Sequence, residues 1–387
     1  MRRAGDDAAD WLVGRLEEME ADLSALVEVN SWTENPEGGR RVGVLLRAQL
    51  ALPGLTAEVV PSTRYADHLV FRSEGRPGAR PLALVGHLDT VFPPGKFEGY
   101  RREGALRRGP GVLDMKGGLV VISWALKALA ATGGLGRLPP LRLVVVSDEE
   151  VGSPEGVGVI QKAIAGAEAC LVFESGRAGD AIITRRKGTG MAVATAHGRA
   201  AHAGNAHQEG ANALWAIARF VDRVQQFTDY PRGLTVNVGK VVGGQGKNTV
   251  PDHAVAEVDL RFCTREDGEA LVRRFHEAAL EASVGVPGTR IEVKGGVARE
   301  PLERTEGSAA LMDAYGACAH VSGLGWGESP LVGGGSDAST SSSMGIPSID
   351  GLGPRGKGFH TVEEFIEVET LVPKAQALVR FLASRGV

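Results

Sequence analysis

Cysteine, clustered basic residues and long apolar runs are all scarce in this chain of 387 residues. Its three cysteines, Cys170, Cys263 and Cys318, lie far apart and form no CxxC pair, which argues against a disulfide framework and favours buried, reduced thiols. Such cysteine usage fits a cytoplasmic protein. The formal net charge of −4 gives no reason to expect a nucleic-acid partner, because nucleic-acid binders concentrate basic charge on one face.

Targeting and membrane signals are also missing from the sequence. Arg2 and Arg3 are followed by no apolar stretch, so a secretory signal is not expected. No apolar run approaches membrane-spanning length, and no membrane partner is expected. Apolar residues nevertheless make up 43% of the chain, which is enough for a sizeable core, and the length predicts about two domains.

Several short apolar runs end abruptly in histidine or acidic residues. They are 82–85, which leads to His87 and Asp89, 143–146, which leads to Asp148, Glu149 and Glu150, and 170–173, which leads to Glu174. Continuous apolar runs separated by helical segments are typical of buried parallel strands. Ligands of open α/β sheets collect outside the carboxyl ends of the strands, and histidine with carboxylates at those ends indicates a divalent-cation site.

Apolar spacing predicts the other elements of the two ends of the chain. We expect helices at 8–29, 40–52, 116–131, 308–320 and 362–383, strands at 57–60, 68–72, 330–332 and 347–350, and a long loop at 92–111. Asp114 falls where this loop region meets a helix. Long loops in compact domains are usually functional.

The middle of the chain changes character near Lys187. Its patterns predict the order strand, helix, strand, strand, helix, strand, with the segments 193–196, 210–227, 234–242, 254–262, 266–282 and 290–294. This order is the split-βαβ, or ferredoxin-like, pattern. We therefore predict an α/β fold in which residues 1–186 and 298–387 form a discontinuous catalytic domain with a mostly parallel sheet, and residues 187–297 form an inserted domain.

Each polar residue has an ordinary explanation when it is considered singly. A histidine after a strand is usually a hydrogen-bonded structural residue, and acids after a strand often cap the next helix. The coincidence of these residues favours a shared site. The adjacent Glu149 and Glu150 in particular repel each other unless a cation or a proton intervenes.

Seven motifs occur together in one order along the chain. They are GHLDTVFP (86–93), RGPGVLDMKGG (108–118), SDEEVGS (147–153), FES (173–175), GRAAHAG (198–204), GGGSDAS (333–339) and FHTVEE (359–364). As a set they resemble the dizinc exopeptidases and N-deacylases, a family that includes glutamate carboxypeptidase of the carboxypeptidase G type, aminoacylases and succinyl-diaminopimelate desuccinylase. The resemblance covers the chain nearly end to end, including the inserted domain.

The resemblance implies a set of metal ligands and their division between two ions. His87 and Glu174 would bind the first ion, Glu150 and His360 the second, and Asp114 both. Asp89 would orient His87 through its ring N–H. Two Zn²⁺ ions would bring four positive charges, which Asp114, Glu150, Glu174 and one bridging hydroxide would neutralise, so partial burial becomes tolerable. Co²⁺ or Mn²⁺ in place of Zn²⁺ stays open.

The resemblance also implies catalytic residues. Glu149 would act as general base and acid on the water that bridges the ions, which would lie about 3.5–4 Å apart. His202 in the inserted domain would cross a homodimer interface and stabilise the tetrahedral oxyanion. The inserted domain would then serve as both dimerisation surface and lid.

The substrate's free carboxylate would be held by residues of other motifs. Arg261 and Asn248 match such positions, since a guanidinium fork suits a planar carboxylate. Gly334 and Gly335 leave backbone N–H groups open to an anion. Glu at position 174 goes with the carboxypeptidase and deacylase members of the family.

Three functions remain open from the sequence. The first is a zinc carboxypeptidase that releases a C-terminal amino acid, with glutamate as a candidate, from a small peptide or N-acyl amino acid. The second is an N-acyl-amino-acid deacylase or a dipeptidase with the same site. The third is a metal-free, non-catalytic binding dimer, against which the retention of the ligands and Glu149 speaks. The segment RAGDAIITRRKG (177–188) does not cleanly reproduce the glutamate-selecting residues of the glutamate carboxypeptidase. Arg185, Arg186 or Lys187 could select an acidic side chain or could simply be solvated.

Overall fold

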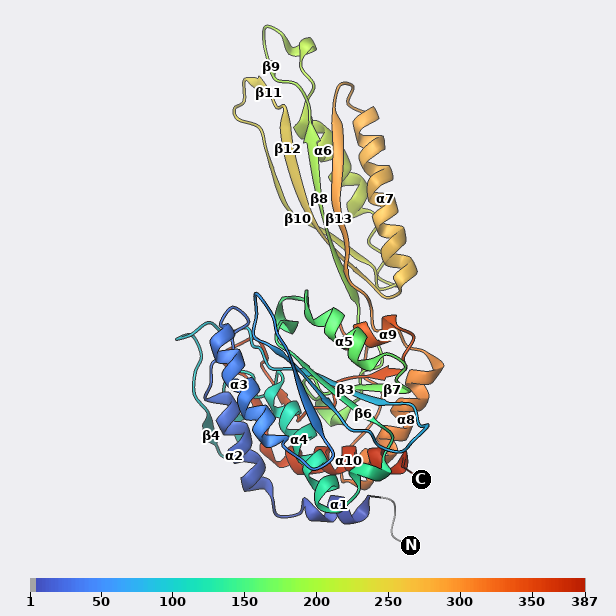
Figure 1. Ribbon diagram of the computed structural model, residues 1–387. Coiled ribbons are helices and arrows are strands. Elements are labelled where there is room, and N and C mark those ends of the chain that lie inside the picture. Colours follow the sequence, from blue (N-terminus) through green and yellow to red (C-terminus); the bar gives the residue numbers. More distant parts are fainter. Residues whose placement is uncertain (1–4, 387) are drawn as a thin grey trace. The chain divides into compact units, whose positions relative to one another are not determined.

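The computed structural model describes residues 5–386 and divides into two compact units (Figure 1). The first unit comprises the chain up to Thr184, Arg304–Leu331 and the chain from Ser336. The second comprises Arg185–Glu303 and Val332–Gly335. The segment Val332–Gly335 clusters with the second unit because Lys187 N donates to Val332 O at 2.9 Å and Arg186 Nη1 donates to Gly334 O at 3.3 Å.

A mixed, mostly parallel sheet forms the centre of the first unit. Its strands lie in the order β1 (Thr56–Val60), β2 (His68–Arg72), β6 (Leu141–Val146), β3 (Leu82–His87), β7 (Ala169–Val172) and β14 (Ser348–Ile349). The four strands β6, β3, β7 and β14 run parallel, whereas β1 and β2 are antiparallel to their neighbours. The predicted α/β class with a mostly parallel sheet is confirmed.

Helices cover both faces of this sheet, which explains why its central strands are continuously apolar. Figure 1 shows α4 (Lys116–Ala131) and α10 (Leu371–Ser384) on one side and α5 (Gly156–Ile164) on the other. The helices α2 (Leu16–Val27) and α8 (Glu306–Val321) extend the layer of α4 and α10, and α9 (Ala338–Ser343) packs beside α5. Every residue of β3 is buried, so its side chains face apolar partners in both directions.

The parallel arrangement brings polar residues of distant segments to one edge. His87, the last residue of β3, pairs in register with Val146, the last residue of β6. Asp148 to Glu150 follow β6 directly, and Glu174 follows β7 two residues after its end. These residues therefore meet at the carboxyl edge of the sheet.

The second unit has the predicted split-βαβ order. It consists of β8 (Gly188–His197), α6 (Ala213–Gln225), β10 (Thr235–Gly243), β12 (His253–Phe262), α7 (Arg265–Val284) and β13 (Arg290–Arg299), and its antiparallel sheet has the order β10-β12-β8-β13. Alternate residues such as Ala192, Ala194 and Ala196 are buried against both helices. A small additional pair, β9 (Ala201–His202) with β11 (Thr249–Val250), carries His202.

One predicted helix is interrupted, and another begins later than predicted. The helix expected at 8–29 is divided into α1 (Asp6–Trp11) and α2, because Gly14 adopts a left-handed conformation with φ of 80°. The helix expected from residue 362 begins only at Leu371. The preceding Phe365–Glu367 forms β16, because it finds an antiparallel partner in β5 (Leu106–Arg108).

Three other predictions need correction. The helix expected at 40–52 is α3 (Pro36–Gln49), which starts earlier because Asn35 caps it by accepting from Gly38 N. The loop expected at 92–111 contains the hairpin of β4 (Arg101–Glu103) and β5. The expected strand at 330–332 forms only an isolated bridge between Val332 and Arg186 within the described part of the chain.

The structure also bears on the expected state of the cysteines and on the expected lack of membrane-spanning segments. Cys170, Cys263 and Cys318 form no disulfide within residues 5–386. Cys170 is buried as expected, and burial raises its pKa to about 12, whereas Cys263 and Cys318 are only half-buried. Among helices within residues 5–386, none has the length and apolar character needed to cross a bilayer.

A buried ion network anchors the segment that follows Glu174. Asp180 forms ion pairs through Oδ1 with Lys374 Nζ at 3.1 Å and through Oδ2 with Arg355 Nη1 at 2.9 Å. Its Oδ2 also accepts a hydrogen bond from Gly325 N at 3.1 Å. The side chains of Asp180 and Lys374 are only 2% and 4% exposed. Removing one charge of such a pair leaves its partner buried without compensation.

We therefore expect Asp180→Asn to lower the free energy of unfolding by about 3 kcal/mol, since Asn tolerates the left-handed φ of 57° at this position but leaves the Lys374 charge unbalanced. Denaturant unfolding of the two proteins would measure the change. The control is Glu257→Gln, which removes an ion pair between side chains that are 60% and 51% exposed and should cost less than about 1 kcal/mol. An equal effect of both substitutions would contradict this role of Asp180.

Candidate metal centre

His87 is held in one orientation by Asp89. Its Nδ1 lies 3.0 Å from the carbonyl oxygen of Asp89 and 3.3 Å from Oδ1 of the same residue, and both side chains are 1% exposed. Because both neighbours of Nδ1 are acceptors, the ring proton belongs on Nδ1 and the lone pair on Nε2. Nε2 has no hydrogen-bond partner among the described residues, although it is buried.

Asp89 also organises the turn that carries the two adjacent glutamates. Its Oδ1 accepts from Glu149 N and its Oδ2 accepts from Glu150 N, both at 3.2 Å, and Thr33 Oγ1 donates to Oδ2 at 2.8 Å. One buried carboxylate thus places the His87 ring and the short helix η2 (Glu149–Val151) relative to each other.

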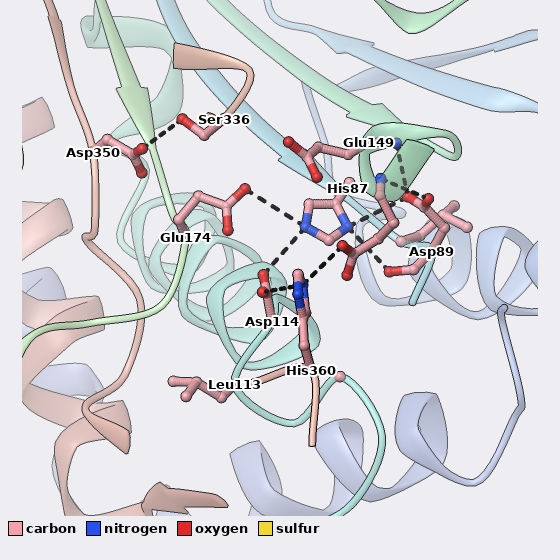
Figure 2. A network of polar contacts seen from close by, with 12 residues as sticks. His87, Asp89, Leu113, Asp114, Glu149, Glu174, Ser336, Asp350 and His360 are labelled. Carbon is pink, nitrogen blue, oxygen red and sulfur yellow. Dashed lines mark hydrogen bonds and ion pairs between the residues drawn. The ribbon is translucent and has the colours of Figure 1, made fainter. Parts of the chain in front are cut away.

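Asp114 lies between two imidazoles (Figure 2). Its Oδ1 is 3.4 Å from His87 Nε2, and its Oδ2 is 3.4 Å from His360 Nε2. Oδ1 is buried and has no hydrogen-bond partner among the described residues. Each oxygen of this carboxylate therefore faces a different histidine.

Each histidine has a second acid beside it. Glu174 Oε1 lies 3.5 Å from His87 Nε2, and Glu150 Oε2 lies 3.0 Å from His360 Nε2. The side chains form two groups that share Asp114, and the same division between ions follows from the family resemblance. Other combinations are also close: ligand atoms of His87, Asp114 and Glu150 all lie within 4.8 Å of one another, and so do those of His87, Glu149 and Glu174. We assign Glu150 to His360 because that pair has the shortest contact of the cluster.

Protons compensate the clustered acids when no cation is bound. Hydrogen bonds to Asp114 and Glu150 raise the pKa of His360 to about 10. Burial raises the pKa of Glu150 to about 7, although His360 opposes this shift. Burial, together with the Asp114 carboxylate, also raises the pKa of Glu174 well above its usual range. Cations at these positions would displace such protons, as metal binding generally does.

The donor set suits a pair of divalent transition-metal ions. Imidazole nitrogens and carboxylate oxygens are ligands of Zn²⁺, and Co²⁺ and Mn²⁺ accept the same types. The buried atoms without partners, His87 Nε2 and Asp114 Oδ1, both face the centre of the cluster. The residues present therefore fit the metals that the resemblance implies.

Glu149 lies beside this cluster. In Figure 2 its carboxylate stands on the side of His87 that also faces Glu174, while its backbone N–H is bound to Asp89. One of its oxygens lies within 4.8 Å of ligand atoms of His87 and Glu174. The side chain is partly accessible, as a group that exchanges protons with a bound molecule must be.

The predicted residues of the inserted domain belong to the second unit. The exposed His202 accepts hydrogen bonds at Nδ1 from the backbone N–H groups of Gly204 and Asn205, both at 3.1 Å. Because Nδ1 accepts these hydrogen bonds, the ring proton resides on Nε2, which is then a donor. Asn248 lies just before β11, and its carbonyl oxygen accepts from Ala203 N at 2.9 Å.

The predicted carboxylate-binding residues have partners within the second unit. Arg261 forms a two-pronged ion pair with Asp259, through Nε to Oδ1 and Nη2 to Oδ2, both at 2.9 Å. A substrate carboxylate would have to compete with Asp259 for this guanidinium. The carbonyl oxygens of Gly334 and Gly335 accept from Arg186 Nη1, so Arg186 is a buried residue of the loop rather than a solvated charge.

Sequence reasoning missed two buried residues that contact this site. Thr33 donates to Asp89 but had no motif to mark it. Glu364 accepts three backbone N–H groups of the loop that carries Asp114, and its place at the end of the motif FHTVEE was the one available signal.

Comparisons with known proteins agree with this fold. Residues 184–286 match the peptidase dimerisation domain of the M20 family. The chain is 29% identical over 370 residues to carboxypeptidase G2 of Pseudomonas sp. (strain RS-16), covering 94% of this chain and 88% of that protein. It is 27% identical over 365 residues to succinyl-diaminopimelate desuccinylase of Variovorax paradoxus, covering 84% and 89%.

A solved structure shows the same two-domain fold. This is a dinuclear metal-binding peptidase of the M20 family from Bacillus subtilis, with a TM-score of 0.73, 14% identity and coverage of 95% of this chain and 98% of that one. The resemblance seen in the motifs is confirmed: part of the chain matches the M20 peptidase dimerisation domain, and the chain is similar over most of its length to both a carboxypeptidase and a desuccinylase.

We expect Zn²⁺ at about 100 times its Kd to stabilise the protein by about 2.7 kcal/mol per site, because the ions bind the folded cluster and not the unfolded chain. Melting temperatures of chelator-treated protein with and without added Zn²⁺ would measure this. Asp114→Asn should abolish most of the shift, whereas Asp313→Asn, at an exposed position of α8, should keep it. A full Zn²⁺-dependent shift in Asp114→Asn would contradict the bridging position.

Proposed function

We propose that this protein is a dizinc amidohydrolase that releases a C-terminal amino acid from a small peptide or an N-acyl amino acid. The observation that carries the proposal is the position of Asp114 between two pairs, His87 with Glu174 and His360 with Glu150. The similarity to carboxypeptidase G2 over most of both chains supports the reaction class. The dinuclear site named for the Bacillus subtilis peptidase supports two ions.

In this proposal His87 and Glu174 would hold one zinc ion, Glu150 and His360 would hold the other, and Asp114 would be shared by both. The ions would supply an acidic water and polarise the amide carbonyl. Asp89 keeps the His87 lone pair directed at the site by accepting its Nδ1–H. The ligand oxygens and nitrogens come from rigid strand ends and turns, so little reorganisation is needed when substrate binds.

Glu149 is the general base and acid of the proposed reaction. Its carboxylate is partly accessible and lies within 4.8 Å of ligand atoms of His87 and Glu174, so it can accept the proton of the attacking water. It can then return this proton to the leaving amine. Its backbone bond to Asp89 keeps the carboxylate beside the ligands throughout.

Glu149→Gln should keep its metal content and lower kcat by a factor of about 10²–10⁴, because the amide cannot accept the proton. Steady-state kinetics together with metal analysis of the same preparation would test this. Glu155→Gln, a nearby glutamate in the following segment, should leave both values unchanged. Near-normal turnover by Glu149→Gln at full metal content would overturn the assignment of the base.

The leaving amino acid would be recognised through its free carboxylate by Arg261, Asn248 and the N–H groups of Gly334 and Gly335. Arg261 is half exposed on β12 and presents a planar fork. The Asp259 pair would keep that fork extended between turnovers. Glutamate is one candidate for the released residue. The alternative, an N-acyl-amino-acid deacylase or a dipeptidase, uses the same site and is favoured by the similarity to the desuccinylase.

Arg261→Gln should raise KM for substrates with a free C-terminal carboxylate by about tenfold or more, because a charge-assisted, two-pronged contact is lost. Amidated analogues should show little change. Hydrolysis of N-acyl glutamate, N-acetyl amino acids and dipeptides by both proteins would measure the effect and separate the carboxypeptidase from the deacylase and dipeptidase functions. Equal increases in KM for free and amidated substrates would contradict this role.

We also propose that the second unit forms a homodimer and that His202 acts across it. The match of residues 184–286 to a peptidase dimerisation domain supports this assembly. Large apolar side chains, including Met191, Trp215 and Val242, are more than half exposed on this unit in the single chain. His202 Nε2–H would donate to the oxyanion that develops on the substrate carbonyl. A cytoplasmic location stays a prediction from the cysteine usage.

A further inference from the structure

We propose that Glu364 is a positioning residue that locks the bridging ligand Asp114 and the second-ion ligand His360 into one rigid element. The inference deepens the proposed function and rests on it, since it assigns a role toward the same pair of ions. Glu364 belongs neither to the ligands nor to the proton-transferring residues of that proposal.

The contacts of Glu364 are concentrated on the loop that leads to Asp114. Its Oε1 accepts from Leu113 N at 2.8 Å and from Asp114 N at 3.0 Å, and its Oε2 accepts from Gly111 N at 3.2 Å. Both oxygens are therefore committed to backbone N–H groups of one turn. The backbone of Asp114 is itself a donor in this set, so the bond acts directly on the residue that bridges.

Burial makes these contacts difficult to replace. Glu364 has no solvent exposure, and water cannot substitute for it as acceptor of the three N–H groups. Burial lowers the pKa of the equally buried Lys116 to about 7, although Glu364 and Asp89 oppose this shift, and its Nζ donates to Val29 O at 3.0 Å. A buried carboxylate with several donors is stable only in a fixed geometry.

The same residue fixes the segment of His360. Glu364 N donates to Thr361 O at 3.1 Å, and Thr361 N and Oγ1 both donate to Gly358 O, at 3.0 and 2.7 Å. These bonds close a tight turn in which His360 adopts a left-handed φ of 63°, a conformation that a non-glycine residue keeps only when its surroundings impose it. Glu364 is the buried end of this turn. Its backbone N–H binds the turn that contains His360, and its carboxylate binds the backbone of Asp114, so one residue positions both ligands.

Metal affinity is the property that should respond to loss of Glu364. Outer partners of metal ligands typically change affinity by about 10–100-fold when they are substituted. Glu364→Ala removes all three acceptor contacts and should weaken binding of both ions, because Asp114 belongs to both groups. Glu364→Gln keeps one carbonyl oxygen for Leu113 N and Asp114 N but turns its NH₂ group toward Gly111 N, so it should fall between Ala and the parent protein.

Glu363 offers a matched control one residue away. Its side chain is 76% exposed and contacts only Arg108 among the described side chains, at 3.3 Å. Glu363→Gln changes the charge of the protein as Glu364→Gln does, but it leaves the backbone contacts of the Asp114 loop intact. It should therefore bind both ions as the parent protein does.

The test is a titration of chelator-treated protein with Co²⁺, followed by the visible absorption of the bound ion, and competition with a chelator to obtain both affinities. The parent protein, Glu363→Gln, Glu364→Gln and Glu364→Ala are compared, with circular dichroism of the metal-free forms to verify folding. We expect parent and Glu363→Gln to agree, and Glu364→Gln and Glu364→Ala to show progressively weaker binding and altered absorption.

Each outcome decides one of the two proposals. Unchanged affinities and spectra in Glu364→Gln and Glu364→Ala would overturn the positioning role while leaving the dizinc function in place. Failure of the parent protein itself to bind Co²⁺ would overturn the proposed function, and the positioning role with it. If Glu364→Ala does not fold, Glu364→Gln decides: weaker binding supports the role, and unchanged binding overturns it.

Discussion

The structure depends on one shared carboxylate. The two oxygens of Asp114 face the imidazoles of His87 and His360, which are far apart in the sequence, and each imidazole has its own glutamate. So many acids in a partly buried place repel one another unless positive charge is supplied. Burial raises the pKa values of Glu150 and Glu174, hydrogen bonds to Asp114 and Glu150 raise the pKa of His360, and a pair of cations would replace the protons that these groups retain.

Two further buried acids hold the cluster together against this repulsion. Asp89 accepts from the His87 ring and from the backbone of Glu149 and Glu150, and Glu364 accepts from the backbone around Asp114. In both cases a carboxylate binds N–H groups of a turn. A turn bound in this way is rigid, and rigid turns place ligands more precisely than flexible loops do. The site is therefore built from carboxylates with two different tasks.

Most elements of the fold could be predicted from the pattern of apolar residues. The helix at 116–131 and the strand at 68–72 were confirmed in full as α4 and β2, because a buried helix and a buried strand have strong periodicity. The predictions were wrong where the local sequence pattern was weak and contacts with other segments, or a single glycine, determined the conformation. Phe365–Glu367 is a strand because β5 offers it hydrogen bonds, and Gly14 interrupts a helix whose apolar spacing continues past it.

The sequence by itself determined which chemical groups are available at the ends of β3, β6 and β7 and, through the set of motifs, which family of hydrolases uses them. The segments that form strands follow from the hydrophobic pattern, and the position of a residue after a strand follows with them. Only the tertiary structure decided that Asp89 serves both His87 and the glutamate turn, that Arg261 is paired with Asp259, and that Glu364 joins Asp114 to His360. These contacts depend on the three-dimensional arrangement of the residues. The spacing of residues along the sequence does not reveal which buried acceptor will bind the N–H groups of a given turn.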